Sequence, residues 1–369
     1  MAKYEPSHLK NMNTKIVFQE FRNSDNESLF VNELARTTKI SVPTVMKIVD
    51  FLTEKELIKE QECTTTKVGR KPNLFKLNNE KFFSIGIVYE GDYLIMGIVD
   101  LAGKVQNFIQ IRCGQHFEQS LFKNIDKLLE MCRKDVDDLI GIGIGIPCIF
   151  DSKTRNITAA PLIGIDKPRY FGDVIDRISK KYNAKVVVDN DLNIQAFGEY
   201  ASFKPSKKED LIFISLGTGL GAGAVIDGKV RRGSNNICGE IGYMMFEYSD
   251  EESKSGWLEE QINLNALKDK FDISETSDAG NQEKAIEYVS RYMALLVNNL
   301  IFCYDTSKIV LDGYVLDLLG DDLLAAIQAK LDRICYKPIK IEKKNVVMPG
   351  LLGGALLASN SWLEEVFKQ

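Results

Sequence analysis

Two consecutive segments decide the fold: Leu211-Ile212-Phe213-Ile214-Ser215-Leu216 and Gly217-Thr218-Gly219-Leu220-Gly221-Ala222-Gly223. The first predicts a buried strand, and the glycines of the second let backbone N–H groups crowd around an anion. The chain continues into another strand that turns at Asp227-Gly228, so the loop joins two strands. A Rossmann site needs a helix after its loop, so the order argues against that class. Phosphate binding and a tight glycine turn both remain open.

Length and composition limit the classes of protein to which this chain can belong. With 369 residues, 44% of them hydrophobic and 27% charged, the chain is long enough for several globular domains. No apolar run is long enough to span a bilayer and no signal peptide precedes the first polar stretch, so we expect no membrane partner. The 7 cysteines are scattered, which suits reduced thiols in the cytoplasm. With only 2 histidines, a multi-histidine zinc site is not expected.

The first 77 residues hold more Lys and Arg than Asp and Glu and predict three short helices. Asn13 is a candidate cap for a helix that runs to Phe21, and Leu34 and Ala35 lie in a second helix that begins near Phe30. The third helix starts at Ser41, the predicted N-cap.

Helical spacing on this third helix predicts an inward face of Val42, Val45, Val49 and Leu52. The opposite face presents Pro43, Thr44 and Lys47, which could reach base edges and phosphates from a major groove. A short three-helix domain of another purpose would look similar.

A basic segment after these helices favours DNA binding. Residues 57–60 and 74–77 predict a hairpin, and between them lies Lys67-Val68-Gly69-Arg70-Lys71-Pro72. An extended arginine beside glycine and proline suits a narrow minor groove, although a solvated charged turn is the simpler alternative. We predict a winged helix-turn-helix in residues 1–78 that contacts DNA through Ser41, Pro43, Thr44, Lys47, Lys67, Arg70 and Lys71.

From Phe82 the chain alternates strands and helices, which indicates an α/β domain. Its motifs resemble those of the ROK family of sugar-responsive repressors and sugar kinases: Gly143-Ile144-Gly145-Ile146-Pro147, Asp189-Asn190-Asp191-Leu192-Asn193, the glycine loop, Gly239-Glu240-Ile241-Gly242 and Gly256-Trp257-Leu258-Glu259. The resemblance implies a two-lobed, actin-like ATPase fold in residues 79–369. The first lobe would comprise about 82–190 plus 348–369, with helices after Met348 returning to it, and the second lobe about 191–347.

The resemblance also implies a ligand site. Asp191 matches the aspartate that takes a proton from the sugar hydroxyl in family kinases, and a carboxylate beside a carboxamide suits hydroxyl recognition. The alternative for this pair is an ordinary cap after a strand. By the same carry-over, Asn190, Glu240 and Glu259 would contact sugar hydroxyls. Tyr243 stands where the family has a histidine, so it could offer one hydroxyl or simply fill space.

Departures from the family pattern argue against catalysis. The aspartate, first glycine and threonine of the first phosphate loop are replaced by Val88, Glu90 and Asp92. We therefore expect ATP not to bind, no catalytic residue, Asp191 as a vestigial base, and a vestigial phosphate loop at Gly217, Thr218, Gly219 and Gly221. The cysteines of the family's zinc motif are missing, so no metal or other cofactor is predicted.

The sequence thus predicts a sugar-responsive transcriptional regulator, a repressor of a carbohydrate-utilisation operon. Its partners would be double-stranded operator DNA and a sugar or sugar derivative, and it would form a homodimer or homotetramer. One alternative is an ATP-dependent sugar kinase, favoured by Asp191 and the second glycine loop. Another is a binding module that responds to a phosphosugar, a different metabolite or a protein.

Overall fold

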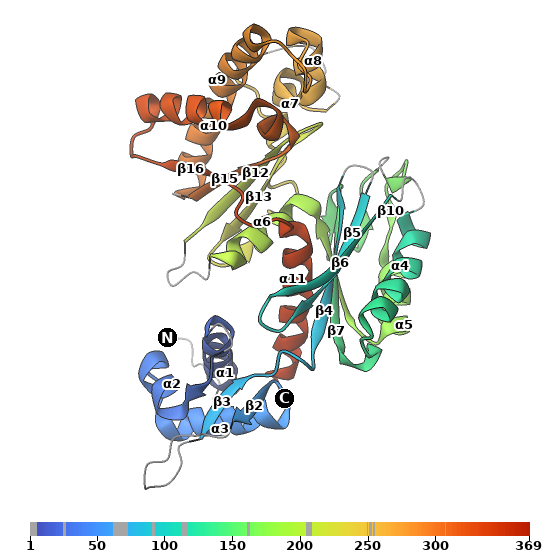
Figure 1. Cartoon of the computed structure of the whole chain (residues 1–369), viewed down its shortest axis with the longest axis vertical. Helices are drawn as coiled ribbons and strands as arrows, with labels where there is room; N and C mark the ends of the chain where they lie inside the picture. Colours follow the sequence, from blue (N-terminus) through green and yellow to red (C-terminus); the bar gives the residue numbers. More distant parts are fainter. Residues whose placement is uncertain are drawn as a thin grey trace.

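The computed structural model describes residues 6–24, 27–61, 73–90, 93–112, 117–160, 163–203, 209–248, 250, 253, 255–306 and 308–369. They form an N-terminal helical part and two lobes that follow one another along the long axis of the molecule (Figure 1). No helix in the described part of the chain is long and apolar enough to cross a membrane.

The N-terminal part is a winged helix-turn-helix. It comprises α1 (Pro6–Asn23), α2 (Val31–Thr38), α3 (Val42–Glu54), β1 (Leu29–Phe30), β2 (Ile58–Gln61) and β3 (Leu74–Leu77), and its antiparallel sheet has the order β1-β3-β2. The predicted hairpin and the second and third helices are confirmed. The cap at Asn13 is wrong, because α1 already begins at Pro6 and Asn13 lies inside it. Val42 is also misassigned, since it is 44% exposed and Ile48 is buried instead.

The first lobe is built on a sheet in the order β11-β7-β4-β5-β6. Its strands are β4 (Phe83–Glu90), β5 (Tyr93–Asp100), β6 (Val105–Arg112), β7 (Leu139–Ile146) and β11 (Lys185–Asn190). Helices α4 (Phe117–Cys132) and α5 (Gly172–Tyr182) bury their apolar faces against it, and η1 (Val136–Asp138) precedes β7. A small sheet of β8 (Phe150–Asp151), β9 (Asn156–Ile157) and β10 (Arg169–Tyr170) extends this lobe. Strands β11 and β4 run parallel to β7, so their carboxyl ends meet at one edge.

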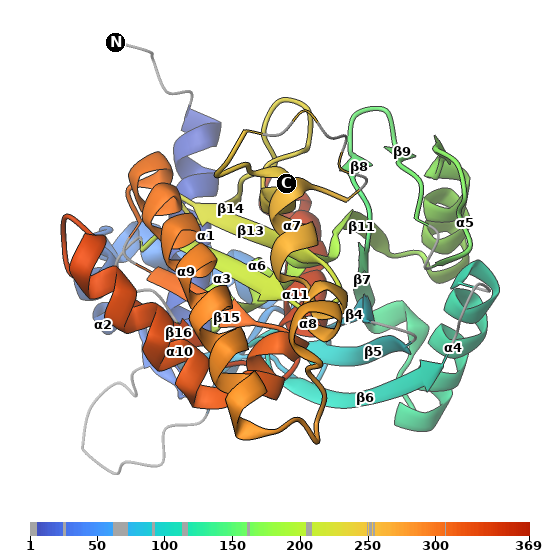
Figure 2. The same ribbon diagram turned by 90° about the horizontal axis from the view of Figure 1, so that it is seen from above.

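The second lobe repeats the plan with the order β14-β13-β12-β15-β16. Its strands are β12 (Leu211–Leu216), β13 (Leu220–Ile226), β14 (Lys229–Val230), β15 (Lys308–Asp312) and β16 (Lys340–Lys343). The helices are η3 (Ile241–Tyr243), α7 (Trp257–Ile262), α8 (Leu264–Phe271), α9 (Ala279–Tyr304) and α10 (Tyr314–Ile334). Seen from above, α9 and α10 cover this lobe on the side away from the N-terminal part (Figure 2).

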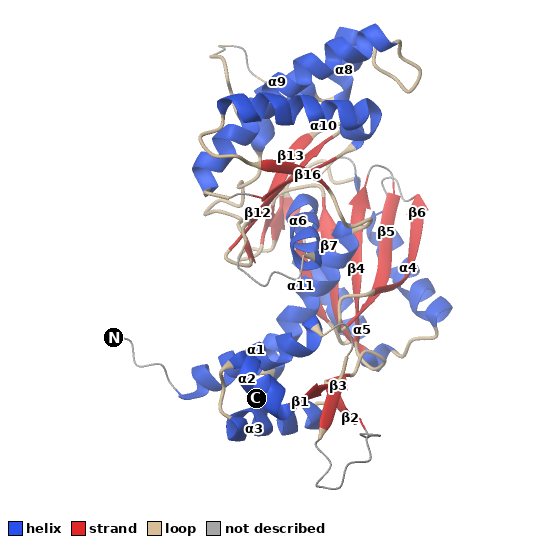
Figure 3. Ribbon diagram, turned by 60° about the vertical axis from the view of Figure 1, so that its left-hand side comes forward, coloured by secondary structure: helices blue, strands red, loops and turns tan. Residues whose placement is uncertain are grey.

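Helices α6 (Asp191–Ser202) and α11 (Pro349–Val366) pack on each other between the two sheets (Figure 3). Glycine makes this approach possible, because a Cβ on Gly198 would lie 1.9 Å from the Pro349 carbonyl oxygen and one on Gly353 would lie 1.9 Å from that of Ile194. The single helix α11 replaces the several C-terminal helices expected from the sequence, and it also contacts β4 and β7 of the first lobe.

Hydrogen bonds from Arg22 on α1 connect the N-terminal part to the first lobe. Its Nε donates to the Leu101 carbonyl at 2.9 Å, and its two terminal nitrogens donate to Asn360 at 2.6 Å and Ser359 at 2.8 Å. Burial lowers the pKa of Arg22 to about 10, with the Asp100 charge opposing the shift. Phe18 also packs edge-on against Phe367 with 5.5 Å between ring centroids. The helix-turn-helix should therefore move together with the first lobe.

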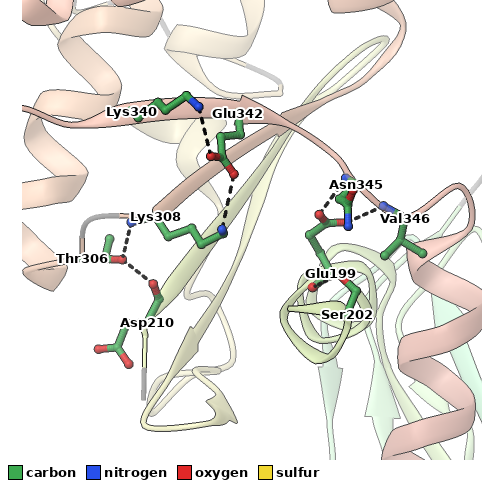
Figure 4. A network of polar contacts seen from close by, with 9 residues as sticks. All are labelled: Glu199, Ser202, Asp210, Thr306, Lys308, Lys340, Glu342, Asn345 and Val346. Atoms are coloured by element: carbon green, nitrogen blue, oxygen red, sulfur yellow. Dashed lines mark hydrogen bonds and ion pairs between the residues drawn. The ribbon is translucent and has the colours of Figure 1, made fainter. Parts of the chain in front are cut away.

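A buried carboxylate holds the segment that returns from the second lobe to α11 (Figure 4). Glu199 of α6 is 0% exposed and accepts hydrogen bonds from the backbone N–H groups of Asn345 at 2.7 Å and Val346 at 3.1 Å. Burial raises the pKa of Glu199, and these two bonds oppose the shift. Glu199 therefore ties the crossover between the lobes to the central helix.

Replacing Glu199 with alanine should lower the free energy of unfolding by roughly 2–4 kcal/mol, because two buried N–H groups lose their acceptor. Urea titration measures the loss, and Glu199→Gln, which keeps one carbonyl oxygen, should lose less. Glu130→Ala on an exposed position of α4 is the control and should change stability by less than about 0.5 kcal/mol. Equal stability of Glu199→Ala and wild type would contradict this role.

Candidate functional site

The Asn190-Asp191 pair lies where β11 ends and α6 begins. The Asn190 side-chain oxygen accepts from the N–H groups of Leu192 at 2.9 Å and Asn193 at 3.2 Å, so Asn190 caps α6. Its side-chain nitrogen lies 3.4 Å from the Cys148 carbonyl oxygen. The capping alternative is thus realised at Asn190, and the adjacent Asp191 carboxylate is left as the group able to contact a ligand.

Asp191 titrates near neutrality. Desolvation raises its pKa to about 7, backbone hydrogen bonds within the first turn of α6 oppose this, and the charges of Glu90 and Glu240 raise it further. A carboxylate with such a pKa can accept a proton from a hydroxyl near pH 7. The position is therefore chemically competent as a base.

Glu240 of the second lobe adds its charge to the environment of Asp191, and Glu259 adds its charge to the environment of Glu240. Glu240 is exposed overall, yet its pKa is raised, first by desolvation and then by the Glu259 charge. Glu259 on α7 accepts a hydrogen bond from the Leu220 N–H at 2.8 Å, and burial raises its pKa as well. Tyr243 is 59% exposed and is the last residue of η3. The structure thus brings Asp191, Glu240 and Glu259 into one electrostatically coupled group from three separate segments.

Two amides of the glycine loop donate hydrogen bonds within the protein. The Gly217 N–H donates to the Gly219 carbonyl at 2.9 Å, and the Leu220 N–H is taken by Glu259. Gly221 lies on β13, not in the loop, and a Cβ there would lie 2.4 Å from the Leu192 side chain. The geometry of the loop favours a tight turn with close packing against α6.

An ion pair lies near Glu90 at the end of β4. Lys344 binds both oxygens of Asp312, at 2.9 and 3.1 Å. Glu90 at the end of β4 has a raised pKa, first from desolvation, with the Lys344 charge opposing and the Asp312 charge adding to the shift. Val88 is buried and packs against Gly350. Asp92, the third altered position, lies outside the described residues.

The buried carboxylate of Asp189 forms an ion pair with the half-buried Arg232, and sequence reasoning missed this pair. Asp189 is 1% exposed, and its Oδ2 accepts from the Arg232 Nε at 2.7 Å. Its Oδ1 accepts from the Asn193 side chain at 2.9 Å and from the Asn190 N–H at 2.8 Å. The pair connects the end of β11 to the segment that carries Glu240. Arg232 follows another arginine after a short strand, so no local signal distinguishes it from a surface charge.

The predicted DNA-reading residues lie at the N-terminus of α3. Ser41, Pro43 and Lys47 are exposed and Thr44 is half-buried. Ser41 is the N-cap residue, as predicted, but its hydroxyl lies 2.8 Å from that of Thr44 and does not cap a backbone N–H. Lys67, Arg70 and Lys71 of the predicted wing lie outside the described residues. Among the described residues, no group of three or more His, Cys, Asp or Glu side chains could hold a metal ion.

Two α/β lobes that enclose a central helix pair, joined to a winged helix-turn-helix, define an actin-like fold with an N-terminal winged-helix domain. The chain belongs to the ROK family, whose model matches residues 84–363. A crystal structure of a ROK family transcriptional regulator, a homologue of the E. coli MLC protein, matches with a TM-score of 0.79, 19% identity and coverage of 98% of each chain. This likeness confirms the predicted fold class.

Relatives in this family include both regulators and kinases. The xylose repressor of Caldicellulosiruptor bescii is 27% identical over 253 residues, which cover 67% of this chain and 62% of the relative. The glucokinase of Halalkalibacterium halodurans is 26% identical over 309 residues, which cover 73% of this chain and 88% of the enzyme.

Proposed function

We propose that this protein is a sugar-responsive transcriptional regulator that represses a carbohydrate-utilisation operon. The observation that carries the proposal is the winged helix-turn-helix joined to the ROK body: a regulator's structure matches 98% of the chain, whereas the glucokinase match covers 73%. Similarity to a xylose repressor supports a sugar as the effector. We place the DNA-binding domain in residues 1–78 and the protein in the cytoplasm, as a homodimer or homotetramer on double-stranded operator DNA.

The effector would bind between the lobes. Asp191, Glu240 and Glu259 offer acceptors for hydroxyl groups, Tyr243 can offer a hydroxyl, and Asn190 orients the turn that presents Asp191. Carboxylates that are partly desolvated and carry like charges favour a guest whose hydroxyls donate to them. A ligand that contacts both lobes would fix the angle between them. Because Arg22 bonds the helix-turn-helix to the first lobe, the position of the helix-turn-helix would follow that angle. We keep the lobe boundaries near residues 190 and 348 as part of this proposal.

A sugar kinase is the second candidate, and the pKa of Asp191 near 7 favours it. Against it, phosphoryl transfer requires metal-bridged phosphates held from both sides. Here the Lys344–Asp312 pair and Glu90 lie at one side, while the glycine loop uses the Gly217 and Leu220 amides internally. We therefore propose that the chain has no kinase activity.

Incubation of the full chain with ATP, Mg²⁺ and a panel of sugars should yield no sugar phosphate above the level of an enzyme-free reaction. A ROK glucokinase assayed alongside confirms that the assay detects product. Formation of a sugar phosphate by wild type, lost in Asp191→Ala, would establish the kinase and overturn the proposal.

A further inference from the structure

Helix α3 exposes two apolar side chains that the fold does not use. Val42 is 44% exposed and Met46 is 36% exposed. Four residues apart, they lie one turn from each other on the same face of the helix. The core of the N-terminal part is filled from α3 by Val45, Ile48, Val49 and Leu52, and neither Val42 nor Met46 belongs to that cluster.

The charge around this apolar pair suits a polyanion. Arg36 at the end of α2, Lys39 in the turn and Lys47 on α3 are all exposed. Within the part of the chain that the structure describes, none of the three forms an ion pair. The acidic residues of α3, Asp50 and Glu54, lie on its later turns. The basic and apolar N-terminal half is the part that a recognition helix inserts into the major groove.

Apolar side chains have a specific partner in that groove. Thymine presents a C5-methyl group there beside its O4 acceptor, whereas the other bases present no methyl group. Exposed Val42 and Met46, flanked by cations that can contact phosphates, therefore match thymine better than they match a polar base edge. A protein partner or a second copy would also cover an apolar patch, but the unpaired cations around it favour DNA.

We propose that Val42 and Met46 are base-reading residues that contact thymine methyl groups in the operator. The inference rests on the proposed DNA-binding function and adds to it which side chains select bases and which base they select. Lys47 then positions the helix through phosphates and carries little sequence information.

The test uses the full chain and duplexes that wild type selects from a randomised library. Each thymine of a selected half-site is replaced in turn by uracil, which keeps the hydrogen-bonding edge and removes only the methyl group. Wild type should lose roughly fourfold in affinity at a contacted thymine, the value expected for one methyl-sized group. Met46→Ala should bind the thymine and uracil duplexes with equal affinity at one position of the half-site. Val42→Ala should do the same at a different position.

Met12→Ala is the matched control, because Met12 is a 48% exposed methionine on α1 and not on the recognition helix. It should retain every uracil effect of wild type. Selected sites without thymine, or uracil effects that persist in both α3 variants, would overturn the inference while leaving DNA binding intact. If wild type binds no duplex at all, the proposed function fails and this inference fails with it.

Discussion

Replacing Arg232 with alanine should lower the free energy of unfolding by about 3–5 kcal/mol, the cost of leaving a buried carboxylate without its cation. Asp189 would keep the two hydrogen bonds to Oδ1, whereas Oδ2 would lose the guanidinium. Arg232→Lys should fall between wild type and alanine, because lysine keeps the charge but not the forked geometry. Urea titration of the three proteins at neutral pH measures the series.

Arg231→Ala is the matched control, since the neighbouring arginine is exposed and forms no ion pair within the described residues. The double variant Asp189→Asn/Arg232→Ala should recover much of the lost stability, because no unpaired charge then remains in the interior. If Arg232→Ala is as stable as Arg231→Ala, the ion pair has no structural role.

Local sequence patterns predicted helices and strands correctly where the buried face of the segment determines its secondary structure. The strand at Leu211–Leu216 and the hairpin turn at Asp227-Gly228 follow from apolar runs and turn residues. Predictions were wrong where the spacing of apolar residues is compatible with more than one buried face. Val42 lies at the edge of the buried arc of α3, so its spacing fits an inward and an outward position equally, and Ile48 fills the core instead.

The candidate site was harder to predict because its contacts join segments far apart in sequence. The Leu220 N–H is satisfied by Glu259, 39 residues later, and Asp189 is neutralised by Arg232, 43 residues later. No single motif contains both members of either pair. The family resemblance grouped Asp191, Glu240 and Glu259, but only the packed structure shows that the Glu240 charge raises the pKa of Asp191 and that the Glu259 charge raises the pKa of Glu240.

Replacing Asp191 with asparagine should stabilise the protein at pH 8 by roughly 2–4 kcal/mol, with a smaller gain at pH 5 and none below about pH 4. The pKa of Asp191 is raised from 3.8 to about 7 in the folded state. Between these values the unfolded chain is ionised while the folded chain holds the proton, so stability falls as pH rises toward 7. Asparagine is neutral throughout and removes that loss. Thermal or urea unfolding from pH 4 to pH 8 measures the difference, and Asp166→Asn at an exposed position is the control.

The same substitution should remove the response to effector, because the carboxylate that is costly to the folded protein is the one proposed to accept hydroxyl groups. In wild type, a sugar that stabilises the protein should change operator affinity about 5- to 150-fold, the usual range of coupling between two sites. Asp191→Asn should bind the selected operator as tightly as wild type does without sugar and should show no change on titration. Since the variant is expected to be more stable, a lost response cannot be assigned to unfolding. A sugar that shifts operator affinity equally in wild type, Asp191→Asn and Asp166→Asn would place the effector site away from Asp191.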